Sequence, residues 1–229
     1  MNNADNVAKK GDSSKQIREH LLDVAEGLFC EKGFAGTSVR DITSRARCNV
    51  AAVNYHFGGK EKLYYEVFYR HMHTLRDIRI ASIKRVMSQG EGEVTLEQLL
   101  HAFAMAFIEL LLDKSKGRRF MKLMVREMLD PYLPKKMFVE EVGRPTLSAL
   151  GEAMAKTCPG LGQKETVMSI LSVIGQLIHT IYLSEIFNAE EDLGLQMPNL
   201  AEMVEHIVAF SAGGILAVAE EGNRKNDGE

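Results

Sequence analysis

The residues best suited to chemistry in this sequence lie between Thr37 and Lys60, and that chemistry is recognition of nucleic acid. Arginine can form two hydrogen bonds with the edge of guanine, and asparagine can do the same with adenine. Alanine allows close approach to a base and can contact the methyl group of thymine. The residues here that could face a DNA groove are Arg40, Arg47, Asn49, Val50, Ala51, Ala52 and Asn54.

Two further residues in this stretch are placed to contact phosphate. Thr37 and Lys60 each stand at the expected start of a helix, where free backbone N–H groups attract anions. Phosphate contacts position a protein on DNA, whereas contacts with base edges specify the sequence. Other interpretations are open for two of the groove residues, because Arg47 can be merely solvated and Asn49 can serve as a helix cap.

The elements that must position these side chains are two short helices joined by a tight turn within Ile42–Leu63. Asn49 predicts the N-cap of the second helix, residues 50–56, and Gly58 can take the positive φ that ends it. Val53 is predicted to face the core. Such a pair is a helix-turn-helix, in which the second helix enters the major groove of DNA.

This stretch, with the helix before it, resembles the DNA-binding domain of the TetR family of repressors. The matching residues are the segment TSVRDI from Thr37 to Ile42, then Ala46, the Tyr-His-Phe of residues 55–57, Lys60 and Leu63. The resemblance implies that Tyr55 and His56 contact the DNA backbone, although His56 can also be a structural histidine. Three positions depart from the family pattern: Arg47 replaces the usual Gly, Cys48 replaces Val, and Asn54 stands where an aromatic residue is common.

The charge of the chain is divided unevenly between its two ends. Residues 1–88 hold 15 Lys or Arg against 10 Asp or Glu, whereas residues 89–229 hold 13 against 21. A basic front and an acidic back predict a nucleic-acid reader joined to a body that does not touch DNA. We expect no membrane span and no signal peptide, and three separated cysteines favour the cytoplasm. No metal or cofactor motif is found, and no enzyme motif, so we expect no enzyme.

Helical periodicity without strand signals predicts an all-α chain of about nine helices. Residues 1–60 are expected to form a three-helix DNA-binding domain, preceded by a frayed tail over residues 1–12. Residues 61–229 are expected to form a helical domain for ligand binding and dimerisation. A long helix over residues 60–87 would connect the two.

The last helix carries a stripe of small residues every four positions. Such a stripe lets a second helix come close, so we expect two helices from each subunit to form a four-helix bundle in a homodimer. The alternative is that the stripe packs within its own chain. The residues expected at this interface are Ala209, Phe210, Gly213, Gly214 and Ala217.

A carboxylate interrupts the apolar face of the helix around residue 120. Glu127 needs a partner there, because burying a lone carboxylate is costly. It either orients a ligand in a methionine-rich cavity or makes an internal ion pair or hydrogen bond. His179 is a further candidate, with a structural role as its alternative. The residues assigned to the ligand cavity are Met105, Phe120, Met124, Glu127, Met128 and His179.

These observations predict a homodimeric transcriptional regulator that binds a palindromic site on double-stranded DNA. The resemblance implies a repressor that is released from its operator by a small-molecule effector of a hydrophobic or drug-like kind. The alternatives are a helical interaction module that has lost DNA binding, or an enzyme that uses Glu127 and His179.

Overall fold

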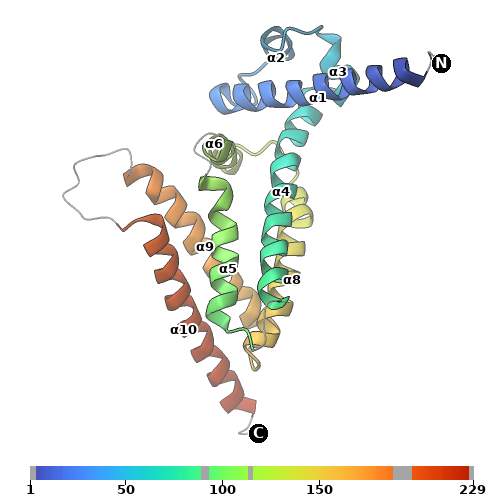
Figure 1. The fold of residues 1–229 in the computed structure, drawn as a ribbon. Helices are drawn as coiled ribbons and strands as arrows, with labels where there is room; N and C mark the ends of the chain where they lie inside the picture. Colours follow the sequence, from blue (N-terminus) through green and yellow to red (C-terminus); the bar gives the residue numbers. More distant parts are fainter. Residues whose placement is uncertain (1–3, 89–92, 113–115, 188–197, 227–229) are drawn as a thin grey trace. The chain divides into compact units, whose positions relative to one another are not determined.

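The structure is a computed structural model of the 229-residue chain and describes residues 4–88, 93–112, 116–187 and 198–226. All regular elements in these ranges are helices (Figure 1), which confirms the all-α prediction. The stretch 135–157 is continuous, with a π-helical turn in the middle, so the described residues form nine helical rods. The elements are α1 (Ala4–Lys32), α2 (Val39–Arg45), α3 (Ala51–Phe57), α4 (Lys60–Ser88), α5 (Leu96–Leu112), α6 (Lys116–Leu129), α7 (Lys135–Phe138), η1 (Val139–Gly143), α8 (Arg144–Thr157), α9 (Gln163–Phe187) and α10 (Leu200–Asn226).

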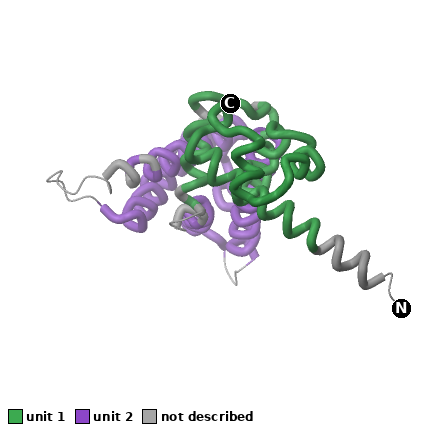
Figure 2. The backbone as a smooth tube through the Cα atoms, turned by 90° about the horizontal axis from the view of Figure 1, so that it is seen from above, with its two compact units in different colours: residues 1–73, 114–137 green, residues 74–113, 138–229 purple. Residues whose placement is uncertain are grey.

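The chain forms two compact units, which Figure 2 shows in different colours. Unit 1 combines residues 1–73 with residues 114–137, and unit 2 combines residues 74–113 with residues 138–229. Helix α4 contributes its first half to unit 1 and its second half to unit 2. Unit 1 is therefore larger than the domain expected from residues 1–60, because α6 packs against α1.

Several helix boundaries follow from caps that the sequence encodes. At the starts of α5 and α10, Thr95 with Gln98 and Asn199 with Glu202 form capping boxes through reciprocal hydrogen bonds between side chain and backbone. Helix α1 instead begins at Ala4, upstream of the start expected near Ser13 and within the tail expected to be frayed. No proline interrupts residues 4–12, so nothing in the local sequence stops the helix there.

The core of unit 1 is largely aromatic. Tyr64 lies at its centre, with its ring centroid 4.9 Å from that of Phe29, 4.9 Å from that of Phe34 and 5.0 Å from that of Phe68. Edge-to-face contacts of this kind add to the free energy gained by burying the rings. The core therefore ties α1 and the loop after it to the first turns of α4.

In unit 2, α5, α9 and α10 contact one another, as Figure 1 shows. By length and composition α10 could cross a membrane, contrary to the expectation that no segment would, but such a single helix is weak evidence. Its polar start is a capping box, and only a third of its apolar window is buried inside the structure. Both α9 and α10 leave large apolar side chains exposed, namely Val167, Met168, Leu171, Ile178, Phe210, Leu216 and Val218.

Candidate nucleic-acid interface

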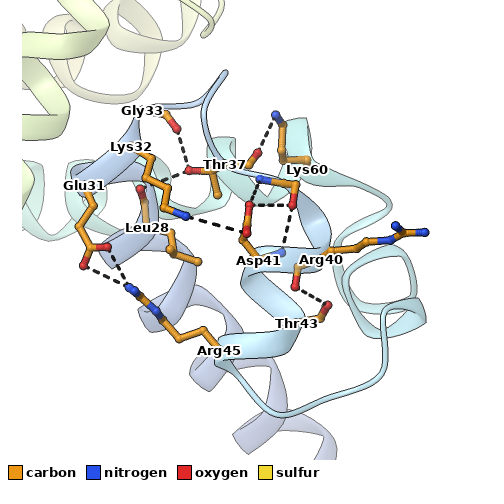
Figure 3. Close-up of polar contacts among 11 residues, drawn as sticks. Leu28, Glu31, Lys32, Gly33, Thr37, Arg40, Asp41, Thr43, Arg45 and Lys60 are labelled. Atoms are coloured by element: carbon orange, nitrogen blue, oxygen red, sulfur yellow. Dashed lines mark hydrogen bonds and ion pairs between the residues drawn. The ribbon is translucent and has the colours of Figure 1, made fainter.

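Helix α2 is fixed at both ends. Ser38 is its N-cap: the Ser38 hydroxyl accepts from the backbone N–H of Asp41, and the Asp41 carboxylate accepts from the backbone N–H of Ser38. The hydrogen bonds from the Ser38 hydroxyl and backbone hold the pKa of the Asp41 carboxyl below its usual value. Ion pairs of Lys32 with Asp41, at 3.9 Å, and of Arg45 with Glu31, at 3.0 Å, join α2 to α1 (Figure 3).

The cap of α2 is one residue later than expected, because the side chain of Thr37 turns inward. Thr37 is 1% exposed, and its hydroxyl donates to the carbonyl oxygens of Gly33 and Leu28 (Figure 3). Thr37, expected at the start of this helix, is therefore not its N-cap, and Ser38 takes that position. Since the Thr37 hydroxyl proton is already used, its expected contact with phosphate would require these internal hydrogen bonds to break.

Lys60 closes the loop between α1 and α2. Its ammonium group donates to the carbonyl oxygens of Phe34 and Thr37, both at 3.0 Å, and lies 4.1 Å from the centroid of the Phe34 ring. An ammonium group has three donors, so one N–H remains after these two bonds. The structure thus gives Lys60 a positioning role that its predicted phosphate contact does not exclude.

The turn between α2 and α3 is a Schellman motif. The N–H of Arg47 donates to the carbonyl of Ser44, and the N–H of Cys48 donates to the carbonyl of Thr43. This motif places Arg47 at φ 54°, in the left-handed region that favours glycine. The backbone here therefore explains why the family pattern has glycine at this position. Arg47 itself is exposed.

Helix α3 has one buried face and one exposed face. Val53 and Phe57 are buried, as Val53 was predicted to be. The N-cap position of α3 is Val50, one residue after the Asn49 expected there, but the Asn49 side-chain oxygen still accepts from the backbone N–H of Ala51 at 2.8 Å, as a capping residue would. Gly58 ends the helix in the left-handed conformation, with φ 76°. The short helix is thereby held firmly at both ends.

The exposed face of α3 is composed of residues named from the sequence. Tyr55 is 81% exposed and Val50 is 49% exposed, whereas Ala52 and His56 are half-buried. Arg40 on α2 is also exposed, and Figure 3 shows its side chain pointing away from the polar contacts that hold α2 in place. The other exposed residues of the predicted set are Arg47, Asn49, Ala51 and Asn54. Seven of the eleven predicted DNA contacts are thus exposed and lie on α2, α3 and the turn between them.

A buried charge cluster fixes α4 against α1. Arg70 pairs with Asp23 and Glu26, and the ring of His71 contacts the same Glu26 carboxylate at 2.9 Å. Burial raises the pKa of Glu26, but the hydrogen bonds and charges of His71 and Arg70 outweigh burial and hold it below its usual value. Glu26 therefore stays ionised and orients the first half of α4.

Glu127 has a full set of partners inside unit 1. Its carboxylate accepts from the Tyr64 hydroxyl at 2.9 Å, and from the backbone N–H groups of Tyr132 and Leu133 at 2.9 and 2.6 Å. Burial, followed by the hydrogen bond to Glu127, raises the pKa of Tyr64, which remains a donor. Of the two interpretations of Glu127, this geometry favours the internal hydrogen bond.

The other residues assigned to a ligand cavity fall in both units. Phe120 is buried in unit 1, where its ring stacks on His71 with centroids 4.6 Å apart, and Met124 is half-buried there. Met105 and His179 are exposed on unit 2, and the side chain of Met128 lies outside the described residues. Neither unit contains the predicted cavity as a whole.

Unit 2 has an open surface pocket of about 510 Å³ that the sequence did not indicate. It lies between the second half of α4, α5 and α10, and a 3.0 Å contact between His101 and Glu205 is part of its lining. Ser82, Gln98 and Ala102 also line it. In the described part of the chain, no group of three His, Cys, Asp or Glu side chains is placed to hold a metal ion.

All five residues expected at the dimer interface lie on one exposed face of α10. Phe210 is 67% exposed, and Ala209, Gly213, Gly214 and Ala217 are exposed beside it. A Cβ atom added at Gly213 or Gly214 would meet no atom within 4 Å in the protomer. The stripe is therefore not packed against the described residues of its own chain.

Two family models match the sequence. Residues 21–67 match the model "Bacterial regulatory proteins, tetR family", and residues 96–215 match "HTH-type transcriptional dual regulator CecR, C-terminal domain". The second match covers more than half of the chain. The first covers the last part of α1, all of α2 and α3, and the start of α4.

Comparison with individual proteins also finds transcriptional regulators among the similar sequences and structures. The chain is 28% identical over 132 residues to the probable HTH-type transcriptional regulator YttP of Bacillus subtilis, a match that covers 53% of this chain and 60% of that relative. A TetR-family regulator from Mesorhizobium loti has a similar fold, with a TM-score of 0.62 and 21% identity over 90% of this chain and 97% of its own. The SmeT–triclosan complex has a TM-score of 0.59 and 20% identity, over 88% and 90% of the two chains.

Proposed function

The chain belongs to the TetR family of bacterial transcriptional regulators, and from that premise we propose that it is a sequence-specific DNA-binding repressor which a small-molecule effector releases from its operator. The observation that carries this proposal is the outer face of α3. Its inner face is buried and both ends are capped, while Val50, Asn54 and Tyr55 point to solvent. A rigid helix with an exposed amide and aromatic ring fits the major groove.

The contacts divide into two kinds. We assign Asn54 and Arg47 to base edges from their side-chain chemistry. Tyr55 and His56 are assigned to the phosphate backbone because the family resemblance implies it. Arg40 extends from α2 on the exposed side and supplies a further positive charge. The charge of residues 1–88, with 15 basic against 10 acidic residues, supports the same surface.

A single short recognition helix buries little DNA surface, so we propose a homodimer that reads a palindromic site. The exposed apolar residues of α9 and α10 support an interface in which these two helices pair with the same two of a partner. The same interface explains why α10 is apolar enough to resemble a membrane span, and a cytoplasmic location is proposed accordingly.

The effector is proposed to be a small organic molecule that binds unit 2. The fold-related SmeT was solved as a complex with triclosan, and the open pocket of about 510 Å³ in unit 2 is large enough for a small organic molecule. An effector that binds one conformation of the dimer more tightly shifts the population away from the DNA-binding form.

The test is a gel shift on the DNA upstream of the protein's own gene, at 50 and 200 mM salt. A regulator of this kind binds that DNA in preference to random duplex, and its affinity falls by about a factor of 10³ or more between the two salt concentrations. An interaction module or an enzyme would give no specific shift. Asn54→Ala should lower the preference for the operator, whereas Lys156→Ala removes an exposed charge from α8 and should leave it unchanged.

A further inference from the structure

Arg79, in the second half of α4, is a buried cation for which the described part of the chain shows no hydrogen bond or ion pair. It is 8% exposed, and its Nε atom is buried without a hydrogen bond. None of the hydrogen bonds or ion pairs found among the described residues involves its guanidinium group. The guanidinium group lies over the ring of Phe107 on α5, whose centroid is 3.8 Å from Cζ.

The neighbouring arginines of the same helix are different. Arg70 pairs with Asp23 and Glu26, and Arg76 pairs with Asp77 at 2.8 Å and with Glu141. These arginines are more exposed than Arg79 and therefore need a partner less. The most deeply buried of the three is the one for which the described residues supply no carboxylate.

A buried unpaired guanidinium is costly, because the charge loses its hydration and receives nothing equivalent in return. Stacking on an aromatic ring offsets part of the lost hydration free energy. The ring covers one face of the guanidinium plane. The Nε–H in the plane remains without an acceptor among the described residues. Burial lowers the pKa of Arg79 to about 10, so the group is still charged at neutral pH. The structure thus holds a positive charge ready for an anion.

A second unsatisfied group belongs to the same unit. The Thr146 hydroxyl on α8 is buried and has no hydrogen-bond partner, and Thr146 is 3% exposed. The ion pair between Arg76 and Glu141 joins the two helical stretches that carry these groups. Arg76 lies three residues before Arg79 on α4. Glu141 lies five residues before Thr146, in the continuous helical stretch 135–157.

We infer that Arg79 is the receptor of an anionic effector, a small organic acid with a carboxylate and an apolar body. This inference rests on the proposed function and names the chemical class of its effector. The Nε and one Nη of Arg79 donate to the two carboxylate oxygens, and the Thr146 hydroxyl donates to one of them. Phe103 and Phe107, whose ring centroids are 5.9 Å apart, supply an aromatic wall for the apolar body. Ser82, which lines the open pocket of unit 2, is one turn further along α4.

The experiment measures thermal unfolding of the full chain with benzoate and hexanoate, and with the matching neutral amides, benzamide and hexanamide, at constant ionic strength. The acids should raise Tm in a concentration-dependent way, and the amides should not. Arg79→Met should raise Tm of the ligand-free protein by a few degrees, because it removes the unpaired charge, and it should weaken the effect of the acids at least ~10-fold. Lys156→Ala, which removes an exposed cation of α8, should respond like the wild type.

A lower Tm of ligand-free Arg79→Met would overturn the inference, because it would mean that a carboxylate of the chain itself pairs with Arg79. Asp113, Glu190, Glu191 and Asp192, which lie outside the described residues, are included in that outcome. Equal shifts by acids and amides, or no shift by either acid, would also overturn it. Should Arg79→Met not fold, Thr146→Val provides the same comparison, with a weakened response to the acids expected and an unchanged response contradicting the inference. Operator binding by gel shift is a separate readout: its absence would refute the proposed function, and its presence without acid binding would refute only this inference.

Discussion

At the scale of single residues, Arg47 combines backbone strain with a charge at the candidate DNA surface. Its φ of 54° is unfavourable for any residue with a Cβ atom, and the Schellman turn requires that conformation. Arginine at this position makes the turn less stable than glycine would. The proposed gain is a positive charge directly before the recognition helix.

Two substitutions separate strain from charge at this residue. Arg47→Gly should stabilise the protein by about 1 kcal/mol in urea unfolding, because it removes the left-handed penalty. Arg47→Ala removes the same charge but keeps the strain, so its stability should stay close to that of the wild type. Both should weaken operator binding equally in a gel shift. Equal stability of the glycine and alanine variants would contradict the strain, and unchanged affinity in both would contradict the DNA contact.

Glu127 is the residue whose role depends most on partners distant in sequence. Glu127→Ala should destabilise the protein by about 3 kcal/mol in urea unfolding, because it leaves the Tyr64 hydroxyl and two backbone N–H groups without an acceptor. Tyr64→Phe removes only one donor and should cost about 1 kcal/mol. Glu152→Ala, an exposed carboxylate on α8, is the control and should cost little. A stable Glu127→Ala variant with a changed effector response would instead favour the ligand interpretation.

At the scale of helices, the sequence predicts helix caps, which are local, but not the contacts between helices. Capping at Asn49, Thr95 and Asn199 depends on residues two or three positions apart, so the sequence contains all the information. The choice between Thr37 and Ser38 depends on which hydroxyl reaches the carbonyls of α1, and both residues have one. The hydrogen-bond partners of Glu127, and the lack of one for Arg79 among the described residues, depend on how segments that are far apart in the sequence pack together. Periodicity indicates that a helix has an apolar face, but not which helix covers it.

Helix α6 is the clearest example, because it belongs to unit 1 although it follows α5 in sequence. Phe120→Ala should therefore destabilise the DNA-binding unit by about 3 kcal/mol, since it removes a buried ring that stacks on His71. Urea unfolding measures the loss, and a gel shift at 37 °C should show weaker operator binding. Lys122→Ala changes an exposed residue of the same helix and should leave both unchanged. Weaker effector response with unaltered stability would contradict this assignment of α6.

At the scale of the whole molecule, the proposed dimer depends on close approach of the helix backbones at Gly213 and Gly214. In the protomer, a larger side chain at either position has free space. The same side chain would separate two helices that pack there. Bulk at these positions therefore distinguishes packing between chains from packing within one chain.

Gly213→Leu should convert the dimer to monomer at micromolar concentration in sedimentation velocity, with a matching loss of operator affinity. The protomer itself should be at least as stable as before, because leucine has a higher helix propensity than glycine by about 0.8 kcal/mol. Ala155→Leu adds comparable bulk at an exposed position of α8 and should remain dimeric. A fully dimeric Gly213→Leu protein would place the interface elsewhere.

The exposure of Tyr55 also has a practical consequence. The chain contains no tryptophan, so a Tyr55→Trp variant would carry a single indole, located on the most exposed aromatic position of α3. Light that excites indole selectively would then report from this one site. Titration with operator duplex should change its emission, and later addition of the effector should restore the original spectrum. One fluorophore would thus follow occupancy and release in real time, in a single cuvette and without labelled DNA.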